Sequence, residues 1–235
     1  MHRRKGRRQA QARGLTWPLR NRLLDAADDR LIDDRNRALL GVAHKPTLRR
    51  AELTALQVTD LFVEMPGDAT LLVRRSKTDT EGRGEMGYLA CDTVRLVRTW
   101  LERSGVTEGR LFRSVRKCGA LGERLDPSQV PRIFKEMACR AGLPAVLVEG
   151  LSGHSAQVGA AQDMIAAGIE LPNILQAGRW KTTSMVNRYG ERLLARRSWR
   201  GCRSAHERAR PLRRRTAARG RLSIQISRTV HRPPP

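Results

Sequence analysis

Five side chains along the chain have the chemistry that attack on a phosphodiester requires. They are Arg49, Lys77, His154, Trp180 and Tyr189. An arginine can clamp phosphate oxygens, a lysine can protonate a leaving oxygen, and a histidine can act as an acid or a base. A tyrosine can supply the nucleophile, and fixed cations can supply the electrostatic stabilisation. These residue types predict phosphodiester cleavage that uses neither a metal ion nor another cofactor.

Each of these residues, taken alone, is weak evidence for a site. An arginine on a helix is most often a solvated charge, a lone histidine is more often a structural group, and a tyrosine near a helix end usually packs. The combination and its order along the chain carry the prediction. In TLRRAEL, Arg49 stands three residues before Glu52, so a helix would place both on one face.

The C-terminal half of the pattern resembles the tyrosine recombinases. The resemblance is carried by GHSAQVGAAQDMIAAGIELPNILQAGRWKTTSMVNRYGERL and by the nine-residue spacing from Trp180 to Tyr189. TLRRAEL and RRSKT extend it, so that it covers roughly residues 33–195. It implies an α+β, mainly helical fold: a tyrosine-recombinase catalytic domain with a small antiparallel β-sheet among helices.

The resemblance also implies a role for each matching residue. Arg49 would be the first phosphate-binding arginine, and Glu52 its structural partner. Lys77 would be the β-hairpin lysine that protonates the leaving 5′ oxygen, and His154 the acid/base histidine. Trp180 would donate its indole N–H to the scissile phosphate. Tyr189 would be the nucleophile that forms a 3′-phosphotyrosyl link.

One catalytic position departs from the family pattern. Tyrosine recombinases carry a second arginine three residues after the histidine, and this chain has Gln157 there. A glutamine can donate a hydrogen bond, but it has no charge and cannot form a two-pronged guanidinium clamp. Loss of one preorganised donor lowers a rate by roughly 10²–10³-fold. Arg179, at a position where the family has a small residue, is the candidate compensating cation, and we hypothesise that it reaches the phosphate.

Two further departures concern the ends of the chain. Family members carry an N-terminal core-binding domain, whereas only some 18 residues precede the first predicted helix, so we expect weakened DNA affinity and site choice. The apolar periodicity of the family's C-terminal docking helix is missing after residue 197. We therefore expect a basic arm over 1–18, a catalytic domain over 19–197 and a basic, disordered tail over 198–235.

The net charge of +23 predicts a polyanionic partner. Residues 1–14 contain six Lys or Arg and no acid, and residues 196–235 contain thirteen Arg and one acid. We expect these ends to attract phosphates in a salt-sensitive way, although arms without a selected role are the alternative. A membrane surface is the competing partner, but no apolar run approaches the ~20 residues of a spanning helix. We therefore expect double-stranded DNA and no membrane.

The cysteines and the N-terminus indicate the compartment. No apolar segment follows the basic N-terminus, so a secretion signal is not expected. The cysteines are far apart and lack zinc-binding spacing, which favours free thiols in a reducing cytoplasm. We expect a cytoplasmic, nucleoid-associated protein of bacterial or phage type. The four cysteines are Cys91, Cys118, Cys139 and Cys202.

The elements that must position the candidate residues are mainly helices. Apolar periodicity and turn residues predict a small sheet within them. Strands are predicted over 58–64, 69–75 and 87–90. Helices are predicted over 19–30, from Asp33 or Asp34 to Pro46, and over 50–56, 92–104, 126–142, 155–167, 172–178 and 182–189. Asp33 or Asp34 is expected to cap the second helix and Asp92 the helix over 92–104, while His154 is expected to open the helix over 155–167. Residues 76–86 are expected to form a polar connection between strands.

Three functions compete at this point. The first is an enzyme for site-specific DNA recombination and integration, impaired at Gln157. The second is a catalytically inactive pseudo-recombinase that binds DNA. The third is a basic nucleic-acid-binding protein of unrelated fold, for which the order of the five residues would be chance. Because family members act as tetramers on DNA, the expected protein partner is a second copy of this chain or a full-length recombinase.

Overall fold

The computed structural model describes residues 11–45, 47–65, 67–74 and 84–209. The chain divides into two units, residues 1–196 and residues 197–235. The first unit contains the hydrophobic core and the candidate site residues that the structure describes.

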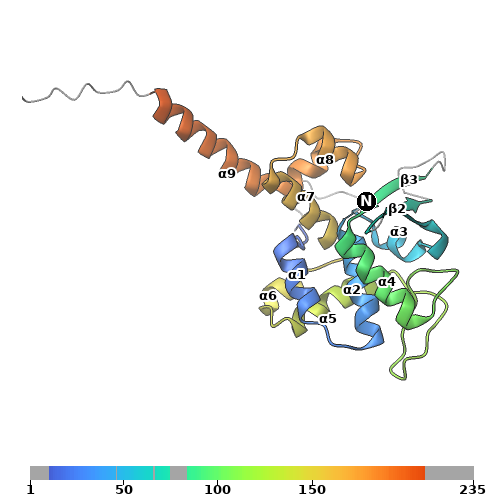
Figure 1. Cartoon of the computed structure of the whole chain (residues 1–235). Coiled ribbons are helices and arrows are strands. Elements are labelled where there is room, and N and C mark those ends of the chain that lie inside the picture. Colours follow the sequence, from blue (N-terminus) through green and yellow to red (C-terminus); the bar gives the residue numbers. More distant parts are fainter. Residues whose placement is uncertain (1–10, 46, 66, 75–83, 210–235) are drawn as a thin grey trace, which may run out of the picture. The chain divides into compact units, whose positions relative to one another are not determined.

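The first unit is mainly helical, and its small sheet lies at one edge, beside α3 and α4 (Figure 1). Along the described residues, helices come first, three consecutive strands follow, and further helices come last. The elements are α1 (Trp17–Asp25), α2 (Leu31–His44), α3 (Arg50–Ala55), the 3-10 helix η1 (Val58–Asp60), β1 (Leu61–Met65), β2 (Asp68–Val73), β3 (Glu85–Leu89), α4 (Cys91–Ser104), α5 (Gln129–Arg140), α6 (Ala145–Glu149), α7 (Ser155–Ala167), α8 (Leu171–Gly178) and α9 (Thr183–Ala209).

The strands form one antiparallel sheet in the order β1-β2-β3. Thr70 of β2 lies between Phe62 of β1 and Tyr88 of β3. Burial alternates along β2, where Ala69 and Leu71 are buried, because successive side chains point to opposite faces of a sheet. One face therefore joins the core, and the face with Phe62 and Tyr88 is exposed. The predicted small antiparallel sheet among helices is confirmed.

Helix α2 is central to the core. Its residues Ala38, Leu39, Leu40 and Val42 have no exposed surface. It packs against α4, α7, α3 and α1 (Figure 1). Such a helix is buried on most of its sides, which explains why apolar residues occupy more than one stripe of its sequence. The C-terminal end of α2 leads directly into the turn that carries the first candidate arginine.

The two aspartates expected to cap α2 do not cap it. Arg30 is at the N-cap position, and Asp33 and Asp34 lie inside the first turn, buried. Asp33 pairs with Arg140 of α5, and Asp34 pairs with Arg103 of α4 at 2.7 Å. Guanidinium partners stabilise a buried carboxylate strongly, so these residues hold α2 against its neighbours. The capping prediction was wrong because it considered the local chain alone.

The expected strand over 58–64 also begins differently. The Asp60 carboxylate accepts a hydrogen bond from the Gln57 N–H at 2.9 Å, which closes the η1 turn before β1. Asp92, expected to cap α4, instead binds Arg20 at 3.0 Å, and Ala90 is the N-cap residue. Helix α6 has no counterpart among the predicted helices.

The N-terminal segment joins the domain earlier than expected. The Arg13 N–H donates to the Gly150 carbonyl, and the Leu15 N–H donates to the Ser155 carbonyl, each at 2.8 Å. Leu15 is fully buried. The expected arm over 1–18 is therefore wrong for its last residues, which are held by the chain segment leading into α7. Residues 1–10 of that arm lie outside the described residues.

Helix α9 continues beyond the end of the expected domain. It extends from Thr183 to Ala209, so the tail expected to be disordered from 198 is helical as far as Ala209. Arginine, alanine and glutamate in this stretch have high helix propensity, which the apolar periodicity did not take into account. The remainder of the tail lies outside the described residues. Across the described segments, α9 included, every helix is too short or too polar to span a bilayer.

Candidate active site

Arg49 and Glu52 form the base of the candidate site at the start of α3. Arg49 is the N-cap residue, and its backbone N–H donates to Glu52 Oε2 at 3.0 Å. Its Nη1 donates to Glu52 Oε1 at 2.8 Å. Glu52 is buried, whereas 27% of the Arg49 side chain is exposed. The carboxylate thus fixes the guanidinium, and the guanidinium still faces solvent.

Arg179 approaches the same carboxylate from the end of α8. Its Nη2 donates to Glu52 Oε2 at 2.5 Å, and its Nη1 donates to Glu85 Oε2 at 3.2 Å. Its side chain is only 6% exposed. The backbone of Arg179 has φ 53° and ψ 41°, the left-handed conformation of a helix C-cap. That conformation is unfavourable for a residue with a Cβ atom, so the two ion pairs hold Arg179 in it.

Gln157 lies on α7 and is also buried. Its Nε2 donates to the Thr47 carbonyl at 2.7 Å. Thr47 has φ 52° and lies in the turn between α2 and α3, two residues before Arg49. Its hydroxyl donates to the Ala177 carbonyl of α8 at 3.4 Å. The amide of Gln157 is therefore engaged in holding the turn that presents Arg49.

Trp180 and Tyr189 pack against each other beside this cluster. Their ring centroids lie 5.9 Å apart with an interplanar angle of 69°, an edge-to-face arrangement. Trp180 approaches so close to Gly178 that a Cβ there would lie 2.0 Å from the indole ring. Only glycine permits this approach at the end of α8. The indole in turn covers the Tyr189 ring, which is 8% exposed.

The electrostatics connect the tyrosine to the arginine. Burial raises the pKa of the Tyr189 phenol, and the positive charges of Arg188 and Arg49 act in the opposite direction. Geometry connects them as well: the Tyr189 ring packs on Trp180, the neighbour of Arg179, and Arg179 shares the Glu52 carboxylate with Arg49. These contacts bring the start of α3, the end of α8 and α9 into one cluster, although Arg49 and Tyr189 are 140 positions apart in the sequence.

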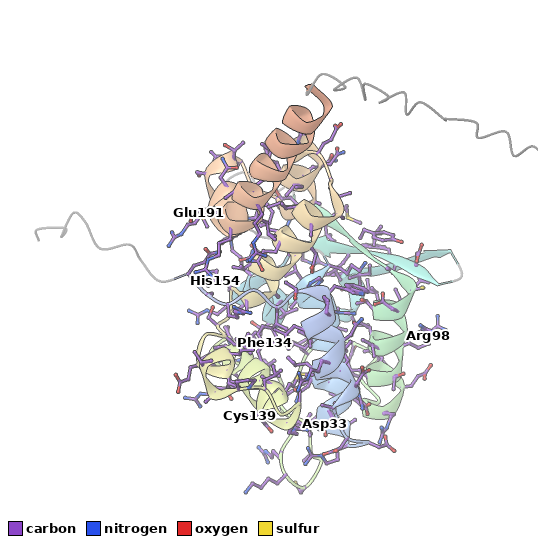
Figure 2. The ribbon with its side chains drawn as sticks, turned by 90° about the vertical axis from the view of Figure 1, so that its left-hand side faces the viewer. Asp33, Arg98, Phe134, Cys139, His154 and Glu191 are labelled. Atoms are coloured by element: carbon purple, nitrogen blue, oxygen red, sulfur yellow. The ribbon has the colours of Figure 1, made fainter. Side chains whose placement is uncertain are left out.

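His154 is at the N-cap of α7, one turn before Gln157, and its side chain is exposed. Figure 2 labels it near this end of the helix. Its backbone N–H donates to the Ser152 hydroxyl at 3.1 Å. The prediction that His154 opens a helix is confirmed. Lys77 lies outside the described residues, so its predicted role remains a prediction.

The raised pKa of Tyr189 gives a testable dependence of stability on pH. Below the ordinary phenol pKa of 10.0 the folded and unfolded states are both protonated, and the contribution of burial is fully present. As pH rises above that value, the unfolded chain loses its proton first, so stability falls. We expect the parent chain to lose more unfolding free energy between about pH 8 and about pH 11 than Tyr189→Phe. Urea unfolding followed by circular dichroism measures this difference; equal losses in the two proteins would contradict it.

A family model described as the phage integrase family matches residues 19–194. The chain belongs to the phage integrase family. Recombinase Cre of Escherichia phage P1 is 35% identical over 173 residues, which are 68% of this chain and 50% of Cre. An integrase/recombinase XerD homologue of Selenomonas ruminantium is 28% identical over 172 residues, or 70% of this chain and 49% of that protein.

Solved structures of the phage integrase type share the fold. XerH recombinase, in a post-cleavage complex with a palindromic difH substrate, superposes with a TM-score of 0.62 at 17% identity, covering 77% of this chain and 50% of that one. A lambda integrase dimer bound to a COC′ core site gives 0.54 at 17% identity, covering 79% and 50%. The expected tyrosine-recombinase catalytic domain is confirmed. The chain spans about half the length of the curated relatives it matches.

Two members of the site were not predicted. Glu85 at the start of β3 binds Arg179, and Thr47 connects Gln157 to the Arg49 turn. The sequence placed Glu85 in a polar connection, where a charged residue is unremarkable. Thr47 follows Pro46, which indicated a helix end and nothing more. Both act through contacts between distant elements, and a linear pattern carries no signal of that kind.

Proposed function

We propose that this protein is a site-specific DNA recombinase that cleaves and rejoins double-stranded DNA through Tyr189. The observation that carries the proposal is the chain of contacts from the buried Tyr189 ring through Trp180 and its neighbour Arg179 to the Glu52–Arg49 pair. A phosphodiester bound by Arg49 and by the indole of Trp180 would be next to that phenol. Cre, at 35% identity, and the DNA complexes of XerH and lambda integrase support DNA as the substrate.

The proposed reaction conserves the number of phosphodiester bonds. The Tyr189 oxygen attacks phosphorus and forms a 3′-phosphotyrosyl bond while the bond from phosphorus to the 5′ oxygen breaks. His154 accepts the phenol proton, and Lys77 donates a proton to the 5′ oxygen. Rejoining is the reverse, with a 5′ hydroxyl as the nucleophile. Arg49 stabilises the charge that develops on the phosphate oxygens.

Gln157 impairs this reaction in the proposal. Its amide nitrogen already donates a hydrogen bond to the Thr47 carbonyl. Gln157 therefore brings no charge to the phosphate, and one of its N–H donors is already used. Removal of one preorganised donor costs roughly 10²–10³-fold in rate. The same contact favours a second candidate, a pseudo-recombinase that binds DNA without cutting it. The two candidates differ in whether a covalent DNA adduct forms.

The proposed partners follow from the same reasoning. We propose that the chain acts on bacterial or phage DNA at the nucleoid, as a homo-oligomer or together with a full-length recombinase. The experiment that tests the enzyme uses nicked suicide duplexes with randomised sequence, from which a cleaved strand cannot be religated. DNA that stays attached to the protein through denaturation is purified and sequenced. Recovery of a preferred sequence supports a site-specific enzyme; failure to recover attached DNA contradicts it and favours the pseudo-recombinase.

Deletion of residues 198–235 should flatten the salt dependence of DNA binding. This segment contains most of the thirteen arginines counted from residue 196 onward. Each phosphate neutralised by a cation contributes about −0.9 to the slope of log K against log salt. Fluorescence anisotropy of a labelled duplex at several salt concentrations measures the slope. An unchanged slope after deletion would mean that this segment does not contact DNA phosphates.

A further inference from the structure

The negative charge of Glu52 limits how strongly Arg49 alone can attract a phosphate group. Glu52 is buried and contacts the Arg49 guanidinium at 2.8 Å. A buried carboxylate cancels most of the field of a cation at this distance, because little water lies between or around them to screen the pair. With neutral Gln157 at the other arginine position, Arg49 and Glu52 alone would offer an anionic phosphate almost no net attraction.

Arg179 changes this charge balance. Its Nη2 binds the same Glu52 oxygen that accepts the Arg49 backbone N–H, so the carboxylate lies between two guanidinium groups. Two cations around one buried anion leave a net charge of one. Within the residues described, Nε of Arg179 is buried and has no hydrogen-bond partner. The side chain thus retains a donor beyond its two ion pairs.

Glu85 is the second carboxylate on Arg179, but it differs from Glu52. Its side chain is 37% exposed, against 4% for Glu52. Water screens an exposed carboxylate far more than a buried one. The field of Glu85 at the site is therefore weak, and its contact mainly orients the guanidinium.

We infer that Arg179 is a positioning residue that supplies the second positive charge of the phosphate site in place of the residue lost at position 157. It acts by binding Glu52, so that the carboxylate no longer neutralises Arg49. Gln157 instead stabilises the turn at Thr47 through its hydrogen bond to the Thr47 carbonyl. This inference rests on the proposed function, since it assumes that the cluster binds a phosphate group.

An alternative explanation is that Arg179 is only a buried structural residue. Its left-handed backbone argues against this, because a glycine would fit that conformation without strain. A purely structural role also makes no prediction about anion affinity. The test therefore measures phosphate binding directly, without requiring cleavage.

The first measurement is an NMR titration of the full chain with inorganic phosphate. The chain has four tryptophans, and the indole N–H resonance of Trp180 is identified by its loss in Trp180→Phe. We expect phosphate to shift this resonance, and Arg179→Gln to weaken the fitted affinity by about tenfold, the effect of one charge-assisted contact. Arg98→Gln, an exposed change on α4 that removes the same charge, is the matched control and should leave the affinity within about twofold.

Two further variants protect the test against misfolding. Arg179→Gly suits the left-handed backbone, which offsets part of the stability lost with the two ion pairs, and it should bind phosphate as weakly as Arg179→Gln; circular dichroism checks that it is folded. Glu85→Gln should leave phosphate affinity within about twofold, because water already screens the exposed carboxylate and the Glu52 contact stays intact. Unchanged phosphate affinity in both Arg179 variants, or no shift of the Trp180 resonance in the parent, overturns the inference.

The second measurement tests whether a cation at position 157 can replace the cation at position 179. Gln157→Arg introduced into Arg179→Gly should restore phosphate affinity, because it returns a cation to the site from the other side. A structural role for Arg179 predicts no such rescue. The two proposals fail separately: normal phosphate binding without a Tyr189–DNA adduct contradicts the enzyme alone, whereas adduct formation that is insensitive to Arg179→Gly contradicts this inference alone.

Discussion

We expect Tyr189→Phe to abolish covalent attachment to DNA while leaving DNA binding intact. The phenol oxygen is the proposed nucleophile, and phenylalanine keeps the ring that packs edge-to-face on Trp180 at 5.9 Å. Loss of a nucleophile leaves no alternative path to a 3′-phosphotyrosyl bond, so the effect is the complete loss of the adduct. The measurement is the fraction of protein that migrates with labelled suicide duplex on a denaturing gel.

The chain provides a matched control for this substitution. It has two tyrosines, and the other, Tyr88, lies exposed on β3 with its hydroxyl donating to Asp68 at 2.9 Å. Tyr88→Phe should form adduct at the parental rate. An adduct that persists in Tyr189→Phe would show that another residue is the nucleophile, and an adduct lost in both variants would indicate an effect on folding.

Gln157→Arg should raise the initial rate of adduct formation by at least ~10-fold, because it restores a charged, two-pronged donor at the phosphate. Gln157 is buried and donates to the Thr47 carbonyl at 2.7 Å. A guanidinium has five N–H donors, so arginine can keep the bond to Thr47 and still present donors to the phosphate. Quenched-time gels with the parent and the variant at one protein concentration give the ratio.

Two variants separate this effect from its alternatives. Thr99→Arg adds the same charge at an exposed position on α4 and should leave the cleavage rate nearly unchanged. Gln157→Met keeps a similar volume but leaves the Thr47 carbonyl without its donor, which should cost about 1–3 kcal/mol of stability. A flat response to Gln157→Arg would mean that the missing charge does not limit the reaction.

The sequence predicted the fold well where the pattern is local. Helix α7 has its predicted bounds, 155–167, because a glycine ends it at Gly168 in the left-handed conformation. Predictions failed where distant partners decide the outcome. Asp33 satisfies its carboxylate through Arg140 of α5, more than a hundred residues away, and no helix-capping rule contains that information.

The candidate site was partly predictable for a similar reason. Residue type and order along the chain predict Arg49, Trp180 and Tyr189 as candidates, because their chemistry is visible in the sequence. The state of Arg179 was not visible, because it depends on Glu52 and Glu85 meeting at its guanidinium. Sequence proximity to Trp180 gave the hypothesis that this arginine reaches the phosphate; its contacts with two carboxylates come only from the three-dimensional arrangement.

The ion pair between Arg179 and Glu85 has a mechanical consequence. Glu85 begins β3 and follows Lys77, the proposed proton donor, by eight positions, while Arg179 directly precedes Trp180. This ion pair connects the first residue of β3 to the C-cap residue of α8, so we expect a displacement of β3 to move the guanidinium and the neighbouring indole together.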